Sequence, residues 1–214
     1  MTGRYTYRLG TQATVIRADV PFGVPLDETF VAQNLADAGY HTALFGKWHL
    51  GFYQRAFTPL ARGFDEHLGY YQGCVDYYKH TGGAYGGMSG GVDWHRGNET
   101  TCFSDSGNYT AELIVPEANE FLHRMKAKAA AAAKPFFLYL PFHLIHAPNQ
   151  VPQRYEDLYD AAYPGLVATA SAESQGLCGV CACPSHSNGA NATWAQCRTV
   201  LAMAAALDES VGEV

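Results

Sequence analysis

Two short segments of the sequence combine basic side chains with glycine or proline, and they hold the residues best suited to chemistry. The first is Gly46-Lys47-Trp48-His49-Leu50-Gly51. In an extended backbone, alternate residues point to one side, so Lys47 and His49 could face one ligand together. An ammonium and an imidazole N–H suit the oxygens of a tetrahedral anion, and flanking glycines let the backbone approach closely. The alternative is a surface lysine and a histidine bonded to nearby backbone.

The second segment, Pro141-Phe142-His143-Leu144-Ile145-His146-Ala147-Pro148, carries two imidazoles. Imidazole gains and loses a proton near neutral pH, so it can protonate a leaving group or donate to an anion. We assign this candidate role to His146. A histidine that only caps a loop is the alternative, and we adopt that interpretation for His143.

Each of these segments follows a predicted strand, and a helix precedes each strand. Apolar residues at helical spacing predict a helix over residues 28–38, with Asp27 as its N-cap and Gly39 as its C-terminal stop. The aromatic and β-tolerant residues 40–45, bounded by Gly39 and Gly46, predict a strand. Helix followed by strand is the repeating unit of an α/β fold.

The same order recurs later in the chain. Residues 109–133 predict a second helix, in which Pro116 either lies near the first turns or marks the start. The apolar run 136–140 predicts a strand buried on both faces of a parallel sheet. Ligands of open parallel sheets collect at the carboxyl ends of the strands, so both basic segments are predicted to lie at one edge of the sheet.

The region between these halves is predicted to be loop. Residues 51–107 are rich in glycine, tyrosine and charged residues, and the tract 81–91 is too glycine-rich for a core element. Tyr77 and Tyr78 lie beside Asp76 and could line a sugar-binding cleft. Packing in the core or within a loop is the commoner role of such tyrosines.

Composition limits the possible classes of function. The chain of 214 residues is 48% hydrophobic and 13% aromatic, which favours a folded core. The chain has 14 Lys and Arg residues and 20 Asp and Glu residues. Its net charge of -6 gives no positive potential that would attract the phosphate backbone of a nucleic acid. No apolar stretch has the length of a membrane span, and the first residues do not resemble a signal peptide.

Six cysteines and three acceptor sequons favour the secretory pathway, either lysosomal or extracellular. The candidate glycosylation sites are Asn98, Asn108 and Asn191. The cysteines of residues 178–183, together with Cys197, favour disulfides over a zinc site, because a second CxxC pair or a spaced histidine pair does not accompany them. The sequence does not determine how the cysteines pair.

Several motifs follow one another in an order that resembles the type I sulfatases, most closely the arylsulfatase B-like group. They are MTGRY, VPLDETFVAQNLADAGYHTALFGKWHLGFY, ARGFDEHLGY, DYYKH, KPFFLYLPFHLIHAPNQVP and LDESVGEV. The resemblance covers most of the chain and is weakest over residues 82–101 and 164–196. The weak parts are a loop-rich region and a Cys-rich stretch over residues 165–196, which is an insertion or the product of an incorrect gene model.

The resemblance implies an alkaline-phosphatase-like α/β fold with a mostly parallel sheet. Residues 1–214 would form part of the N-terminal catalytic domain, with the sheet incomplete at both ends. The family binds one divalent cation, usually Ca²⁺, beside a formylglycine made from cysteine or serine. The hydrated formylglycine attacks sulfur, and the sulfated enzyme then eliminates sulfate. The implied partner is a sulfated small molecule or glycan, and the oligomeric state is unknown.

Matching positions carry the family's functional residues over to this chain. Lys47 resembles the lysine that contacts the sulfate ester, His49 the histidine that assists the nucleophile, and His146 the histidine that contacts the ester oxygen. The nucleophile's CxPSR motif and the usual metal ligands are not present in the sequence. Because these groups supply the covalent step and charge stabilisation, the chain alone is predicted to be inactive.

Two other functions fit the same residues. One is a phosphatase or phosphodiesterase of the same superfamily, although the GKWHLG element argues against it. The other is a non-catalytic protein that binds sulfate or a sulfated glycan. Arg4 and Arg8 could neutralise an anionic substrate in either case, and solvated or structural roles are the alternative for both.

Overall fold

The structure is a computed structural model that describes residues 1–82, 91–100, 104–132, 134–164 and 194–214. The described chain divides into two compact units. The first contains residues 1–143 together with Val214, and the second contains residues 144–213.

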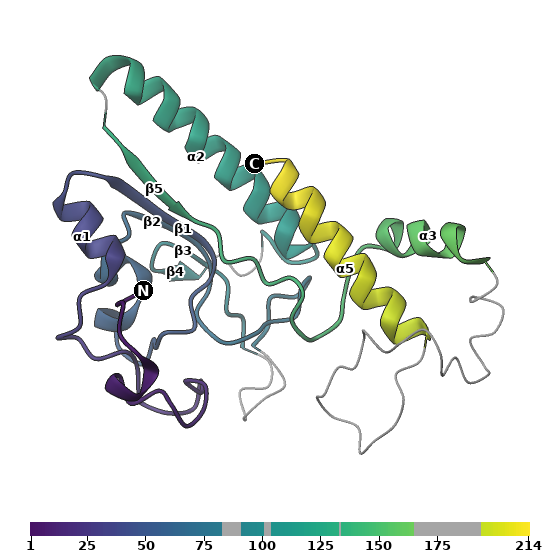
Figure 1. The fold of residues 1–214 in the computed structure, drawn as a ribbon, viewed down its shortest axis with the longest axis horizontal. Coiled ribbons are helices and arrows are strands. Elements are labelled where there is room, and N and C mark those ends of the chain that lie inside the picture. The colour runs from purple at the N-terminus through teal and green to yellow at the C-terminus, as the bar shows by residue number, and fades with distance from the viewer. Residues whose placement is uncertain (83–90, 101–103, 133, 165–193) are drawn as a thin grey trace. The chain divides into compact units, whose positions relative to one another are not determined.

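A five-stranded sheet forms the centre of the first unit, in the order β4-β3-β2-β1-β5 (Figure 1). Strand β1, which is second from one edge, pairs in parallel with both β2 and β5, whereas β3 and β4 add an antiparallel hairpin at the other edge. The strands are β1 (His41–Lys47), β2 (Glu66–Tyr70), β3 (His95–Arg96), β4 (Glu99–Thr100) and β5 (Phe136–Tyr139). The predicted α/β fold with a mostly parallel sheet is confirmed.

Helices cover the two faces of this sheet. On one face, Phe45 of β1 and Leu68 of β2 pack against Ile114, Ala118 and Phe121 of α2 (Thr110–Ala132). The other face packs against α1 (Val31–Asp37) and the loops around it, where Leu44, Trp48 and Phe30 are buried together. Short 3₁₀ helices are η1 (Thr6–Arg8), η2 (Arg55–Phe57) and η3 (Pro59–Arg62). Two apolar clusters therefore fix both sides of β1.

The second unit contains α3 (Gln153–Ala162) and α5 (Trp194–Gly212), which pack against each other. Arg198 of α5 joins them through Asp160, at 2.7 Å, and Glu156, at 3.0 Å. Cys197 of α5 is disulfide-bonded, which agrees with the prediction of disulfides rather than zinc at this cysteine. The other cysteines of the predicted cluster lie outside the described residues, as do residues 83–90 of the glycine-rich tract.

The first predicted helix begins later than expected. It starts at Val31 rather than Glu28, and Phe30 occupies the N-cap position that was predicted for Asp27. The backbone N–H of Phe30 donates to Gln33 Oε1 at 2.9 Å, so Gln33 supplies the capping contact. Burial of Phe30, which is 1% exposed, determines this start. The predicted stop at Gly39 agrees with its positive φ of 90°.

Two predictions about strands were wrong. The region 51–107 is not all loop, because β2 (Glu66–Tyr70) is a nearly buried strand next to β1. The strand β5 is not buried on both faces, since Phe136 is 43% exposed and Tyr139 37% exposed. Among the described strands β5 lies at the edge and pairs only with β1.

The other elements agree more closely with their patterns. Strand β1 continues two residues beyond the predicted end and includes Lys47. Helix α2 matches the prediction within a residue at each end, with Pro116 exposed inside it rather than at its start. Within the described residues, no helix is long and apolar enough to cross a membrane.

Two glycines set the spacing between β1 and β2. Gly46 and Gly69 are register partners, and both have positive φ, 132° and 151° respectively. A Cβ added to Gly69 would lie 2.0 Å from the carbonyl oxygen of Gly46. The strands can therefore pair at this point only if residue 69 has no side chain.

We predict that Gly69→Ala lowers the free energy of unfolding by about 3 kcal/mol or more, because the new methyl group collides with backbone that cannot move aside. Urea denaturation of the chain measures the change. The matched control is Gly39→Ala, which also has a positive φ but no atom within 4 Å of the added Cβ. The control is expected to cost about 1 kcal/mol, and equal losses in both variants would contradict the collision.

Candidate active site

Lys47 is the last residue of β1, at the carboxyl end of the parallel strands. Its side chain is half-buried, and burial lowers the pKa of its ammonium below 10.5, while the nearby Cys74 opposes this weakly. In the described part of the chain, the ammonium has no ion-pair or hydrogen-bond partner. A desolvated cation without a counter-ion is unfavourable in the free protein and favours an anionic ligand.

His49 has an unusual backbone conformation for a residue with a side chain. Its φ is +56°, and its amide N–H donates to the carbonyl oxygen of Tyr71 at 3.1 Å. The ring Nε2 lies 3.0 Å from the carbonyl oxygen of Ile16. Because a carbonyl only accepts, Nε2 carries the proton in this contact. Strained backbone of this kind concentrates at functional sites, where the surrounding structure holds it in place.

Gly73 makes room for the His49 ring. A Cβ at position 73 would lie 2.6 Å from Cε1 and 2.9 Å from Nε2 of His49. The ring therefore packs directly against the backbone of the loop that follows β2. Sequence reasoning missed Gly73, because the strand before it was not recognised.

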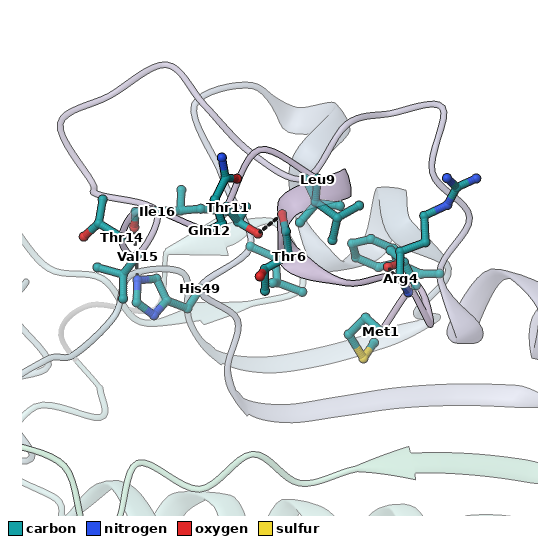
Figure 2. Close-up of a pocket in the computed structure, with 14 residues that line it drawn as sticks. Met1, Arg4, Thr6, Leu9, Thr11, Gln12, Thr14, Val15, Ile16 and His49 are labelled. Carbon is teal, nitrogen blue, oxygen red and sulfur yellow. Dashed lines mark hydrogen bonds between the residues drawn. The ribbon is translucent and has the colours of Figure 1, made fainter.

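His49 lines a pocket of about 530 Å³ beside the N-terminal segment (Figure 2). His49 lies near Thr14 and Val15, while Arg4 and Met1 lie towards the opposite end. The lining is mixed, because threonines and Gln12 alternate with apolar side chains. Its residues are Met1, Thr2, Arg4, Thr6, Leu9, Thr11, Gln12, Thr14, Val15, Ile16, Val24, Phe30, His49 and Leu50.

Lys47 is not among the residues that line this pocket. Side chains alternate along β1, so Ala43 and Phe45 pack on the α2 side whereas Leu44 and Trp48 pack on the other. By this alternation Lys47 lies on the α2 side, as Ala43 and Phe45 do. His49 has a positive φ, so the alternation of an extended strand does not apply to it. The expectation that Lys47 and His49 face one ligand from an extended segment is therefore not met in this pocket.

The two histidines of the second segment differ strongly. His143 belongs to the first unit, is 2% exposed and stacks on the Tyr77 ring, with ring centroids 3.9 Å apart. It is a packed core residue rather than the predicted loop cap. His146 belongs to the second unit and is exposed, with Nδ1 2.7 Å from the carbonyl oxygen of Ala147. This contact places a proton on Nδ1, because a carbonyl oxygen only accepts.

The remaining predicted residues have mainly structural roles. Arg4 pairs with Glu28 at 2.8 Å while also lining the pocket, and the exposed Arg8 lies over the ring of Tyr7. Tyr77 is fully buried, as the packing alternative predicts.

Three further sites had been predicted from sequons. Asn98 is exposed in the turn between β3 and β4, and Asn108 is exposed just before α2. Asn191 lies outside the described residues. The two described asparagines are therefore accessible for modification.

No metal site is formed within the described ranges. No group of three or more histidine, cysteine, aspartate or glutamate side chains there is arranged to hold an ion. The described residues therefore do not fit the Ca²⁺ site that the resemblance implies, and no role in holding a metal ion is assigned to them.

Comparisons with known proteins identify relatives of this chain. The sulfatase family model matches residues 1–214. Mouse arylsulfatase J is 34% identical over 159 residues, covering 74% of this chain and 26% of its own length. Human arylsulfatase A is 32% identical over 174 residues, covering 70% of this chain and 31% of its own length. The chain thus spans about a quarter to a third of the curated relatives it matches.

Solved structures show the same fold. The crystal structure of Ps i-CgsB in complex with k-i-k-neocarrahexaose matches all of this chain and 41% of its own, with a TM-score of 0.68 and 23% identity. A structure in complex with its substrate D-glucosamine-2-N,6-O-disulfate matches 75% of this chain and 26% of its own, with a TM-score of 0.52 and 21% identity. The chain belongs to the sulfatase family and has its alkaline-phosphatase-like α/β fold.

Proposed function

We propose that this chain supplies the sulfate-contacting part of a sulfuric ester hydrolase of the arylsulfatase type. The substrates of the complete protein would be sulfate esters of sugars or aryl alcohols. Family membership supports the reaction class, and two structural neighbours crystallised with a neocarrahexaose and a disulfated glucosamine support a sulfated sugar. The observation that carries the proposal is the half-buried ammonium of Lys47, which has no counter-ion among the described residues.

Lys47 suits the sulfate group for an electrostatic reason. Attack on a sulfate ester builds negative charge on the sulfuryl and leaving-group oxygens. A partly desolvated ammonium interacts with that charge more strongly than a fully hydrated one. Its position at the end of β1 also agrees with the tendency of ligands to bind at the carboxyl ends of parallel strands.

The two histidines would divide the proton chemistry. His49, with Nε2 donating to Ile16, would present Nδ1 as a base or hydrogen-bond acceptor near the nucleophile. His146 would contact the ester oxygen and protonate the leaving alcohol. These roles follow the resemblance, and the proton position on His49 follows from its carbonyl contact.

Calcium and formylglycine would be held by residues outside this chain. We therefore assign no step to either group here and propose that the chain alone does not turn over a sulfate ester. The complete protein would enter the secretory pathway, to a lysosomal or extracellular location. The exposed Asn98 and Asn108 and the disulfide-bonded Cys197 support that location.

We predict that Lys47→Met reduces the affinity of the chain for inorganic sulfate at least about tenfold, because the variant keeps the apolar stem and loses only the ammonium. Isothermal titration measures the affinity. Lys79→Met is the matched control, since Lys79 is an exposed lysine of the same unit. Binding that survives in the Lys47 variant would reject the site. Release of sulfate from a chromogenic aryl sulfate by the wild-type chain would show that it is a complete catalyst.

We also predict that the stability of the wild type relative to Lys47→Met rises with pH. Burial lowers the Lys47 pKa in the folded chain below 10.5, so between the folded and unfolded pKa values the unfolded chain binds more protons. The cost of burying the ammonium is complete below the folded pKa and disappears as pH rises towards 10.5. Denaturation of both proteins from about pH 8 upward measures the difference, which would stay constant if Lys47 were fully hydrated.

Secretion gives a further prediction. When the chain is produced in a secretory eukaryotic cell, we expect glycans at Asn98 and Asn108, because both side chains are exposed. Intact mass before and after N-glycosidase treatment counts them, and Asn98→Gln and Asn108→Gln assign each one. Secreted chain with unmodified asparagines at both positions would contradict the prediction.

A further inference from the structure

Tyr70 has a buried hydroxyl without a hydrogen-bond partner. It is the last residue of β2 and 0% exposed, and no described residue bonds to its Oη atom. Buried hydroxyls are rarely left in this state, because they lose their hydrogen bonds to water and gain nothing in return. The exception at Tyr70 needs a physical reason.

The position of Tyr70 relative to Lys47 gives one. The two residues are register partners at the ends of β2 and β1. Paired residues of parallel strands point to the same face, and their strands lie about 4.8 Å apart. Tyr70 packs in the cluster on the α2 side, which is the side that Lys47 takes by alternation from Phe45. The side chains of Tyr70 and Lys47 therefore leave the sheet next to each other, on the same face.

The polar groups near Lys47 and Tyr70 form no hydrogen bond or ion pair with either side chain in the described chain. Burial raises the pKa of the Cys74 thiol, so Cys74 stays neutral near both residues. The Tyr77 hydroxyl donates to the carbonyl oxygen of His143 at 3.1 Å. The nearby carboxylate of Asp93 accepts from the backbone N–H groups of Tyr71 and Gln72. Lys47 and Tyr70 are left as a cation and a neutral hydroxyl, side by side and without other partners in the described chain.

We propose that Tyr70 is a positioning residue for Lys47. When an anion binds, the Tyr70 hydroxyl oxygen accepts one hydrogen bond from the Lys47 ammonium and holds the two remaining N–H bonds towards the anion. The two side chains are not hydrogen-bonded in the structure, and the flexible lysine stem allows the movement that brings them together. This inference rests on the proposed anion-binding role of Lys47.

Tyr71 provides the contrast within the same strand end. Its ring lies in the cluster on the opposite face, and its hydroxyl donates to the carbonyl oxygen of Gly97 at 3.0 Å. Tyr71 is thus the neighbouring tyrosine whose hydroxyl has a hydrogen-bond partner, and it is not the register partner of Lys47. Tyr71→Phe is therefore the matched control for Tyr70→Phe, since both remove one buried oxygen and keep the ring.

The test compares the wild-type chain with Tyr70→Phe and Tyr71→Phe. Inorganic sulfate affinity is measured by isothermal titration. Titration of the Lys47 amine is followed through the ¹³Cε signal of a chain labelled with ¹³C-lysine, with its signal assigned by Lys47→Arg. For Tyr70→Phe we expect sulfate affinity to fall about fivefold and, with sulfate present, the Lys47 titration to move roughly one pH unit lower, because a bond to the charged amine is lost. Tyr71→Phe is expected to lower the denaturation midpoint and to leave both readouts unchanged.

Each other outcome has a defined meaning. Tyr70→Phe that raises the denaturation midpoint and leaves the Lys47 titration unchanged would overturn the inference, because the hydroxyl would then be an unfavourable group without a role. Equal effects of both variants on the Lys47 titration would also overturn it. A wild-type chain that does not bind sulfate would reject the proposed anion site and the positioning role with it, whereas unchanged sulfate binding by Tyr70→Phe would overturn the positioning role alone.

Discussion

The parallel pairing of β1 with both of its neighbours determines where every candidate residue of the first unit lies. At Gly46 the three backbones come unusually close, because an added Cβ there would lie 2.2 Å from the carbonyl oxygen of Pro141. The next amide, that of Lys47, donates to the same carbonyl at 2.9 Å. Lys47 thus leaves the sheet between Tyr70 on one side and the start of the second histidine segment on the other. Side chains at this junction would separate the strands and displace Lys47.

Sequence patterns predicted the elements that local composition and spacing mark clearly. Helix α2 was found from the helical spacing of its apolar residues, and the first strand from its aromatic and β-tolerant residues between Gly39 and Gly46. Strand β2 was missed because Glu66-His67-Leu68-Gly69-Tyr70 has no β-branched residue and a glycine in its interior. Tertiary packing makes it a strand, and the resulting burial lowers the pKa of His67 to about 3. A charged form of His67 is thereby excluded, which no local pattern could indicate.

The candidate site was predictable in its residue types and only partly in its geometry. Lys47 and His49 were found from their place after a strand. The absence of Lys47 from the pocket that His49 lines was not foreseen, because the alternation rule assumes an extended backbone and His49 has a positive φ. Tyr70 and Gly73 were overlooked for a different reason. They follow from β2, and without that strand no rule draws attention to its carboxyl end.

Two desolvated cations of the first unit differ in whether contacts within the described chain compensate their charge. Arg62 is 2% exposed, yet its guanidinium donates to the carbonyl oxygens of Pro25 and Glu28 and lies 4.1 Å from the centre of the Phe30 ring. Those contacts offset much of the loss of hydration and hold the entry to α1 in place. Lys47 has no such contacts among the described residues, so its desolvation lowers the stability of the free chain. An anion that paired with the Lys47 ammonium would remove this cost. Its binding would therefore be strengthened by the free energy that the unpaired ammonium costs the free chain.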